Sequence, residues 1–267
     1  IFQNYRNFIR KKEFEDFLNS KDSPTLLIKE ALISLAALGF GNNIVAKNDE
    51  SINLFNGYQE ILKKVLPPKL GFKRLRIEVP EVILETLSGD FTIDSVSGGI
   101  ASIIELTWQI YMYPNQTEKY TIIIDEPENH LHPELQRSLL PNLIEAFPNV
   151  QFIVATHNPF IITSIPSSKV YVLDYNNSNK IESYKLDDIN KSGTSNDILR
   201  DVLGLESTMP IWAEEKLNQI VNDYSTKPLN ESNLSSLRKN LESIGLEKYI
   251  PKTIVDLMEE KNNDTTK

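Results

Sequence analysis

Residues 73–80 (KRLRIEVP) alternate between polar and apolar positions, which is the pattern of a β-strand with one buried face. Residues 81–93 (EVILETLSGDFTI) predict two more strands around a Ser-Gly-Asp turn. Together these segments indicate an antiparallel β-layer. Apolar residues then recur at helical spacing, and they predict a helix that carries Ile100, Ile103, Ile104, Thr107, Trp108 and Tyr111.

A continuous apolar run at residues 120–124 (YTIII) predicts a central strand buried on both faces. A helix is expected next, because Pro133 suits the first position of a helix. Residues 151–156 (QFIVAT) predict the next buried strand, and residues 170–173 and 181–186 continue the strand pattern. Strand, helix and strand in this order require a crossover, so the sheet is predicted to be mostly parallel.

The last third of the chain has a different pattern, with helices predicted at residues 197–203, 211–224, 232–244 and 251–260. We therefore predict an α/β head over residues 1–190 and a helical C-terminal region over residues 191–267. One of the helices carries an apolar stripe of Leu234, Leu237, Leu241 and Ile244. Such a stripe either packs on the chain's own core or docks a partner, and the pattern leaves both open.

Composition excludes some classes of protein. The chain has 267 residues, a net charge of −9 and no cysteine. An acidic total argues against a protein that coats DNA through bulk charge, although a local basic groove remains open. The lack of cysteine excludes disulfides and thiol catalysis and fits a cytoplasmic location. No apolar run reaches the ~18–20 residues of a membrane span, and no signal peptide is recognisable, so no membrane contact is expected.

Two carboxylates, Asp125 and Glu126, directly follow the strand predicted at residues 120–124. A residue just past the carboxyl end of a central parallel strand faces the ligand crevice of an α/β sheet. There Asp125 is suited to hold Mg²⁺, partly through water, and Glu126 to polarise an attacking water. Phosphoryl transfer needs both tasks. The simpler alternative is a polar turn that ends the strand.

Two further motifs flank this acidic pair. His157 follows the next predicted strand, where a histidine can contact a γ-phosphate. Upstream, Ser97-Gly98-Gly99 precedes a predicted helix, so that Ser97 is suited to cap it and the helix N-terminus to approach a phosphate. Taken alone, each motif has an ordinary alternative. His157 can be a structural histidine, and Ser97-Gly98-Gly99 can be a turn with a helix cap.

Taken in this order, the three motifs resemble those of the ABC-type ATPase superfamily, in particular its SMC, RecF and OLD branch. The resemblance assigns the signature motif to Ser97, Gly98 and Gly99, the Walker B pair to Asp125 and Glu126, the switch histidine to His157, and the D-loop to Asn129, His130 and His132. It implies an ATPase that uses ATP and Mg²⁺. It also implies a homodimer or higher oligomer, in which Ser97 of one subunit contacts the ATP held by the other.

One departure from the family pattern is the absence of the phosphate-binding sequence G-x-x-x-x-G-K-[ST]. Either the chain is a relative that no longer responds to ATP, or the phosphate loop is missing from this sequence. We favour the second explanation. Residues 24–28 (PTLLI) resemble the strand that enters this loop, and residues 30–38 (EALISLAAL) resemble the helix that leaves it. The missing loop would then belong between Ile28 and Lys29.

A rival interpretation takes Glu128, His130 and His132 as metal ligands. Their E-x-H-x-H spacing can present three ligands on one side of an extended turn. A catalytic metal site usually needs an open position and a further ligand.

The tail of the chain carries a second resemblance. Residues 195–205 (SNDILRDVLGL) and the helices after them are similar to the tail of PtuA-type ATPases from Septu and related retron anti-phage systems. The similarity implies an ATP-driven switch that controls a separate nuclease effector, with an HNH nuclease favoured. The alternatives are an SMC- or RecF-like DNA-repair ATPase, and a nucleotide-binding scaffold with negligible turnover that releases an effector.

A local basic run gives DNA or RNA as a further candidate partner. It consists of Lys63, Lys64, Lys69, Lys73, Arg74 and Arg76. The ordinary alternative is a solvated surface.

If the basic run binds DNA, the affinity should fall steeply with salt, because each neutralised phosphate releases counterions. Anisotropy titrations of a labelled duplex between about 50 and 200 mM salt measure this dependence. A flat response to salt would reject DNA contact through these residues.

Overall fold

The computed structural model describes residues 24–113, 119–186, 194–205, 209–225, 227–228, 230–251 and 253–255. The chain divides into two compact units between Ile198 and Leu199. The first unit is α/β, which confirms the predicted fold class, and the second is helical where it is described. The sequence placed the boundary at residue 190, which lies outside the described residues. None of the described helices is long and apolar enough to cross a membrane.

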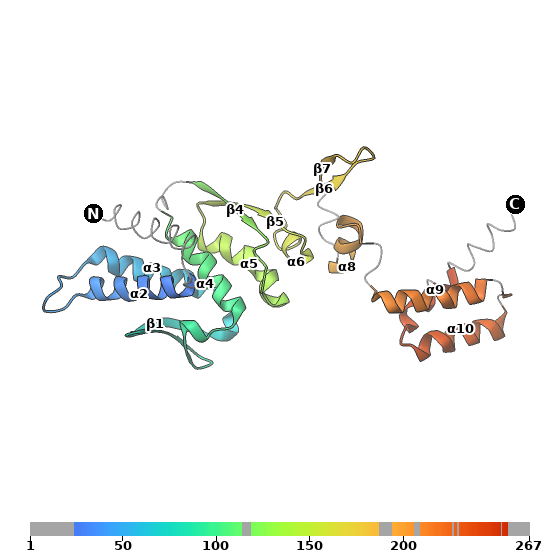
Figure 1. Cartoon of the computed structure of the whole chain (residues 1–267), viewed down its shortest axis with the longest axis horizontal. Helices are drawn as coiled ribbons and strands as arrows, with labels where there is room; N and C mark the ends of the chain where they lie inside the picture. The colour runs from blue at the N-terminus through green and yellow to red at the C-terminus, as the bar shows by residue number, and fades with distance from the viewer. Residues whose placement is uncertain are drawn as a thin grey trace. The chain divides into compact units, whose positions relative to one another are not determined.

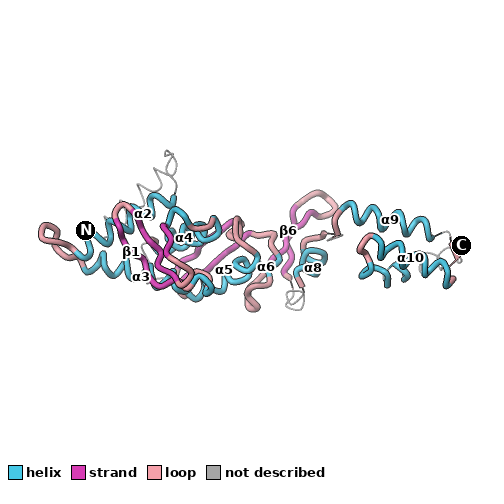
Figure 2. The backbone as a smooth tube through the Cα atoms, turned by 90° about the horizontal axis from the view of Figure 1, so that it is seen from below, coloured by secondary structure: helices cyan, strands magenta, loops and turns pink. Residues whose placement is uncertain are grey.

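Three helices form the first layer of the α/β unit. Helices α2 (Pro24–Phe40) and α3 (Asp49–Val65) lie side by side, as Figures 1 and 2 show, and α4 (Gly98–Tyr111) packs against both. The start of α3 is fixed by Asn48, whose side chain accepts hydrogen bonds from the first turn. Helix α4 confirms the helix that was predicted from the spacing of the apolar residues between Ile100 and Tyr111.

Helix α2 corrects the expectation about its first residues. It buries Ile28, Ala31, Leu32 and Leu35, which is the spacing of one helical face. The strand predicted for residues 24–28 is therefore wrong, because these residues form the start of α2 and Ile28 lies on its buried face. Ile28 and Lys29 are consecutive residues of this helix, and a phosphate loop between them stays a prediction.

The core between α3 and α4 is built on aromatic side chains. Tyr58 is fully buried, its hydroxyl donates to the carbonyl of Ile104 (2.8 Å), and its ring meets Trp108 edge-on at 4.8 Å between centroids. Burial raises the pKa of Tyr58, so the hydroxyl stays a neutral donor. Tyr111 donates to the carbonyl of Leu54 (3.0 Å). These contacts fix α4, and hence the Ser-Gly-Gly motif at its start, on α3.

The predicted antiparallel layer is confirmed. It consists of β1 (Phe72–Glu78), β2 (Glu81–Thr86) and β3 (Asp90–Thr92), hydrogen-bonded in that order. A short 3₁₀ turn, Pro68–Leu70, leads into β1, and another, Ile93–Ser95, leads from β3 towards α4. The layer therefore leads directly into the start of α4, the helix that begins with the Ser-Gly-Gly motif (the signature helix).

Lys29 ties this layer to α2. Its buried ammonium donates to Glu81 (2.7 Å) and to Asp94 (2.5 Å). These hydrogen bonds, that of Asp94 first, raise the pKa of Lys29. A raised lysine pKa stabilises the fold below the unfolded value of about 10.4, and this stabilisation is lost as the pH rises through the folded value. The anchor is therefore intact at neutral pH.

The parallel sheet consists of β4 (Tyr120–Asp125) and β5 (Val150–Ala155), joined by α5 (Pro133–Ala146). The parallel pairing and the crossover helix are as predicted. The expectation of burial on both faces is wrong for the described residues, because burial alternates along both strands and Ile123 is 77% exposed. A run of apolar residues cannot by itself show whether both faces are covered.

Strands β6 (Tyr171–Tyr175) and β7 (Ile181–Lys185) pair with each other in antiparallel fashion. They confirm the two strands predicted at residues 170–173 and 181–186, and within the described residues they form a two-stranded sheet of their own. Their antiparallel pairing follows from the tight turn between them, which Asn176 closes by accepting from the amides of Ser178 (2.9 Å) and Lys180 (3.0 Å). Only antiparallel strands can be joined by so short a turn.

Short helical segments complete the first unit and lead into the second. They are α6 (Pro159–Ile162), α8 (Ser195–Asp197) and the π-helix Ile198–Val202. Thr194 caps α8 in a reciprocal capping box with Asp197. The helix predicted at residues 197–203 is therefore present, although part of it is wound as a π-helix.

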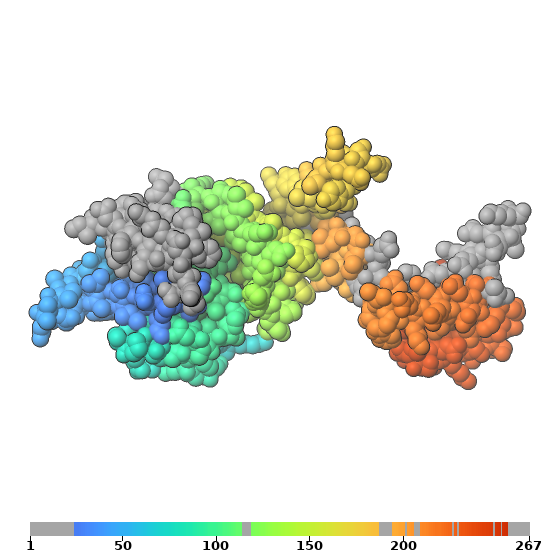
Figure 3. Space-filling model, in the orientation of Figure 1, coloured from blue at the N-terminus to red at the C-terminus, as the bar shows by residue number. Residues whose placement is uncertain are grey.

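In the second unit, α9 (Ile211–Ser225) packs on α10 (Glu231–Ser243), followed by the 3₁₀ turn Glu247–Tyr249. Figure 3 shows these two helices as one compact body in orange and red. Leu237 and Leu241 are buried in its core, with Leu234 and Ile244 packed against it. The apolar stripe therefore packs on the chain's own core. Most of the helix predicted at residues 251–260 lies outside the described residues.

The close contact between α3 and α4 yields a prediction for Gly57. A Cβ built on Gly57 would lie 2.2 Å from the hydroxyl oxygen of Tyr111. Gly57→Ala should therefore destabilise the protein by about 1–3 kcal/mol through overpacking, although alanine is normally favoured over glycine within a helix. Urea unfolding midpoints measure the change.

The matched control removes the clashing hydroxyl. Tyr111→Phe should recover stability in the Gly57→Ala background, because phenylalanine leaves room for the new methyl group. Gly98→Ala should not show the same loss, since a Cβ built there meets nothing within 4 Å. Equal losses at both glycines would contradict the clash as the cause.

Candidate nucleotide site

The site forms where β4 and β5 end side by side. Asp125 lies opposite Ala155 in the parallel register, and the amide of Glu126 donates to the carbonyl of Ala155 (2.9 Å). The pairing therefore continues one residue beyond β4. As a result, the segment after β4 (residues 126–132, here the acidic turn) lies beside the segment after β5 (residues 156–158, here the switch loop).

Glu126 and His157 meet across these two segments. The Nδ1 atom of His157 lies 2.7 Å from Oε1 of Glu126, and Asn129 donates to Oε2 of the same carboxylate (3.2 Å). The side chain of Glu126 is 37% exposed and that of His157 is 77% exposed. The two predicted catalytic side chains therefore form one open pair that a ligand in solution can reach.

The acidic turn holds two residues in unusual backbone conformations. Glu126 has φ 44° and His130 has φ 67°, values that residues with a side chain rarely adopt. Backbone hydrogen bonds stabilise the turn, from Asn129 to the carbonyl of Glu126 (3.2 Å) and from Leu131 to that of Glu128 (3.0 Å). Such conformations cluster at functional sites, where the surrounding structure enforces them.

Ser97 and Gly98 lie exposed at the start of α4, where the Ser97 side chain accepts from the amide of Ile100 (3.5 Å). Gly99 is buried, and a Cβ built on it would lie 3.2 Å from the carbonyl oxygen of His130. The lack of a side chain at Gly99 therefore lets α4 rest on the acidic turn of the same chain. The N-terminus of α4 is nevertheless exposed at Ser97 and Gly98, and a helix N-terminus is a favourable place for an anion.

Asp125 ends β4 with its side chain exposed. A carboxylate beside the Glu126 carboxylate offers the hard oxygen ligands that Mg²⁺ prefers, and Mg²⁺ usually takes only one or two of them from a protein. These residues therefore fit a nucleotide-bound Mg²⁺, with Asp125 as the direct or water-mediated ligand.

The rival metal site is not supported by the positions of its ligands. Glu128 is buried and accepts a hydrogen bond from the hydroxyl of Thr156, while Nδ1 of His132 accepts from the amide of Glu134 (3.3 Å) and caps α5. Within the described residues, no group of three or more His, Cys, Asp or Glu side chains is placed to hold a metal ion. His132 therefore serves as a helix cap.

Carboxylates pair with most of the basic run considered for DNA contact. The pairs are Lys63 with Glu60, Lys69 with Glu134, Arg74 with Glu85, and Arg76 with Glu78, Glu85 and Asp90. The Arg74 guanidinium holds the pKa of Glu85 below its usual range, and Lys69 does the same for the pKa of Glu134. This pairing weakens the local positive field, and DNA contact through Lys63, Lys64, Lys73, Arg74 and Arg76 stays a prediction.

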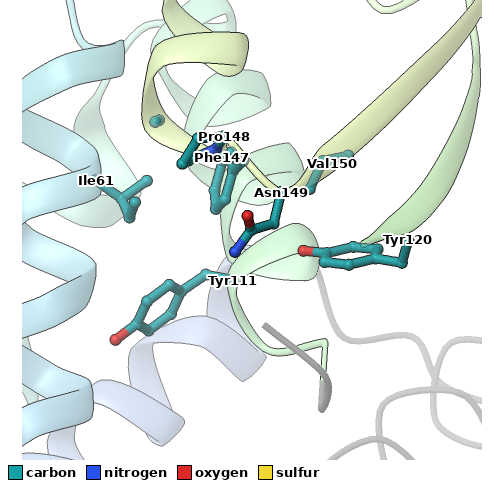
Figure 4. A pocket seen from close by; sticks show the side chains of 8 residues that line it. Ile61, Tyr111, Tyr120, Phe147, Pro148, Asn149 and Val150 are labelled. Atoms are coloured by element: carbon teal, nitrogen blue, oxygen red, sulfur yellow. The ribbon is translucent and has the colours of Figure 1, made fainter. Parts of the chain in front are cut away.

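A shallow hollow lies at the opposite end of the parallel strands. Tyr120, at the start of β4, and Val150, at the start of β5, line it together with Ile61, Tyr111, Phe147 and Asn149, as Figure 4 shows. With a rise of about 3.3 Å per residue, it lies roughly 16 Å along the strands from Asp125. It is therefore separate from the Glu126–His157 pair.

Sequence reasoning missed the polar side chains that support this pair. Glu128, Thr156, Asn158 and Gln136 join the acidic turn, the switch loop and α5 by hydrogen bonds. The available signal was the pair of polar residues on either side of His157. The sequence alone does not give the hydrogen-bond partners of Thr156 and Asn158, because these partners depend on the register in which β4 pairs with β5.

Two parallel strands thus end in an acidic pair beside a histidine, next to a glycine-rich helix start, which is the arrangement that we predicted for a site that binds nucleotide phosphates. The chain belongs to the family described as "AAA domain, putative AbiEii toxin, Type IV TA system", which matches residues 11–163, more than half of the chain.

Curated relatives agree with this family. "Retron Ec83 probable ATPase" of Escherichia coli is 24% identical over 263 residues, covering 96% of this chain and 45% of the relative. "Septu protein PtuA" of Bacillus thuringiensis is 24% identical over 165 residues, covering 56% of this chain and 42% of the relative. The resemblance to retron and Septu ATPases is thereby confirmed. The chain spans less than half the length of both relatives.

A solved structure described as "Structural biochemistry of ATP-driven dimerization and DNA stimulated activation of SMC ATPases" is also similar. It is 17% identical, covers 60% of this chain and 94% of its own, and has a TM-score of 0.43.

Substitution of His132 distinguishes its role as the cap of α5 from the rival role as a metal ligand. His132→Ala should lower the free energy of unfolding by about 0.5–2 kcal/mol, because the first turn of α5 loses its cap, whereas His132→Asp should keep it. Urea unfolding with and without Zn²⁺ measures both effects. A zinc-dependent gain in stability that His132→Ala abolishes would instead restore the metal interpretation.

Proposed function

We propose that this chain is the ATP-binding and ATP-hydrolysing switch of an anti-phage defence complex, in which it controls a separate nuclease effector. The contact of 2.7 Å between Glu126 and His157, at the carboxyl ends of two parallel strands, is the observation that carries the proposal. It unites a carboxylate suited to activate water with a histidine suited to contact a γ-phosphate.

Each residue of the site has a task in this proposal. Asp125 would hold Mg²⁺, whose charge would offset that of the phosphates. Glu126 orients and polarises the attacking water. His157 contacts the γ-phosphate and reports its presence. In the structure both oxygens of Glu126 are engaged, one by His157 and one by Asn129. Binding of the γ-phosphate draws His157 towards the nucleotide and frees one oxygen of Glu126 for water.

The signature motif acts on a neighbouring subunit. Ser97 and Gly98 are exposed at the N-terminus of α4, which is where an anion is favoured. In the proposed homodimer or higher oligomer, this helix start contacts the γ-phosphate of the nucleotide held by the partner. The D-loop residues Asn129 and His130 lie exposed in the adjacent acidic turn and face the same interface, while His132 holds the start of α5.

A phosphate cradle is still needed. The sequence contains no G-x-x-x-x-G-K-[ST] motif, so the described residues supply the water and sensor side of the site and not the cradle for the β- and γ-phosphates. The nucleotide therefore needs phosphate-binding groups beyond the motifs described above. For this reason every test of ATP binding uses the complete protein.

The role in defence is supported by the relatives named as a retron ATPase and as Septu PtuA. By this similarity the effector is a separate nuclease, with an HNH nuclease favoured, and the complex is expected in the cytoplasm. The alternatives remain an SMC- or RecF-like DNA-repair ATPase and a scaffold with negligible turnover. Copurification of the complete protein with the product of the neighbouring gene identifies the effector.

Glu126→Gln should reduce phosphate release by about 10²–10⁴-fold while ATP still binds, because the amide cannot take a proton from water. Single-turnover phosphate release and fluorescent-nucleotide binding, both on the complete protein, measure the two effects. The matched control is Glu145→Gln on the exposed surface of α5, which should release phosphate at the rate of the unmodified protein.

Three outcomes separate the candidate functions. A large loss of phosphate release confined to Glu126→Gln supports hydrolysis as part of the switch. If the unmodified protein and Glu126→Gln both bind ATP and both release phosphate only at the background rate, the result supports the scaffold. Strong stimulation by DNA without any copurified nuclease supports the DNA-repair alternative.

A further inference from the structure

A second layer of contacts lies beneath the Glu126–His157 pair. Glu128 is only 4% exposed, and Oε1 of its carboxylate accepts a hydrogen bond from the hydroxyl of Thr156. The same hydroxyl oxygen accepts from the amide of Asn158 (3.0 Å). Thr156 and Asn158 flank His157 in the switch loop, so this contact ties both sides of His157 to the acidic turn that carries Glu126.

A parallel connection closes the network. The side-chain amide of Asn158 donates to Gln136 (2.9 Å), and Gln136 donates to the carbonyl of Leu131 (2.9 Å). Leu131, like Glu128, is buried in the acidic turn, and it lies beside Gly99 at the start of α4, where a Cβ built on Gly99 would lie 3.5 Å from Cδ2 of Leu131. The network therefore links the switch loop to the acidic turn and, through that turn, to the start of α4.

The burial of Glu128 calls for an explanation. Glutamate is rarely fully buried unless it is paired with a positive charge, and here its contact is with a neutral hydroxyl. Within the described part of the chain, Oε2 of Glu128 has no hydrogen-bond partner. A buried polar atom without a partner costs stability. A carboxylate buried at such a cost, in contact with the neighbour of His157, fits a role in function better than a role in packing.

We propose that Glu128 is a positioning residue that couples the switch loop to the acidic turn and the signature helix. By holding Thr156 it sets His157 against Glu126. When His157 moves towards a γ-phosphate, Thr156 moves with it, and Glu128 passes the displacement to the turn on which Gly99 rests. Binding of ATP in one subunit thereby changes how that subunit presents Ser97 and Gly98 to its neighbour. This proposal rests on the proposed ATPase function.

The coupling is tested by removing either partner in the complete protein. Glu128→Ala and Thr156→Val should each lower single-turnover phosphate release by roughly 10–100-fold, because misplaced catalytic groups lose rate steeply. ATP affinity should change little. Thr156→Ser keeps the hydroxyl and should recover most of the rate. The matched control is Thr121→Val, which removes a hydroxyl that donates across the same two strands to Gln151, away from the site.

Combination with His157→Ala distinguishes positioning from a merely structural role. If Glu128 acts through His157, Glu128→Ala should cause little further loss of rate in the His157→Ala background. An equal fold-loss in both backgrounds, or no loss in either, would overturn the proposal. Urea midpoints of the same variants show how much of any rate change comes from unfolding.

Hydrogen exchange tests the coupling even if the protein hydrolyses no ATP. Glu128→Ala, in the acidic turn, should increase hydrogen exchange of the Asn158 amide in the switch loop. Thr156→Val, in the switch loop, should increase exchange of the Leu131 amide in the acidic turn. Changes confined to the mutated segment would overturn the coupling. Absence of phosphate release from the unmodified protein, together with reciprocal exchange effects, would reject the proposed hydrolysis and retain the coupling.

Discussion

The parallel register of β4 and β5 is the constraint on which the rest of the site depends. Because Asp125 lies opposite Ala155, the residues that follow the two strands emerge at one edge. A shift of one residue would turn every side chain of a strand to the other face. Glu126 and His157 would then no longer meet. The register is held by apolar side chains of the two strands that pack against the main core, among them Ile122, Phe152 and Val154.

Contacts distant from the chemistry bring the third motif to the same edge. Helix α4 is fixed on α3 by the hydrogen bonds of Tyr58 and Tyr111, and the segment before it is held by Lys29 through Asp94. The close approach of Gly99 to His130 then brings the signature helix against the acidic turn. The conformation of the site is therefore set by packing between segments that are far apart in the sequence.

The site has an exposed layer and a buried layer. Glu126 and His157 are accessible to solvent, while Glu128 and Gly99, which contact the two segments that carry them, are buried. Hydrogen bonds in the buried layer restrict where the exposed side chains can lie. This division explains why the short acidic turn contains one accessible carboxylate, that of Glu126, and one that is almost inaccessible to solvent, that of Glu128.

Local patterns in the sequence determined most of the elements and singled out the candidate site residues, because period, caps and strand ends depend on neighbouring residues. Examples are the alternation in β1, the proline that starts α5, and Asp125-Glu126 and His157 after their strands. The tertiary structure decided what depends on distant partners. It placed residues 24–28 in α2 instead of a strand, left one face of β4 exposed, and made His132 a helix cap. It also buried Glu128 beside Thr156, because only the pairing of two separate strands brings those side chains together.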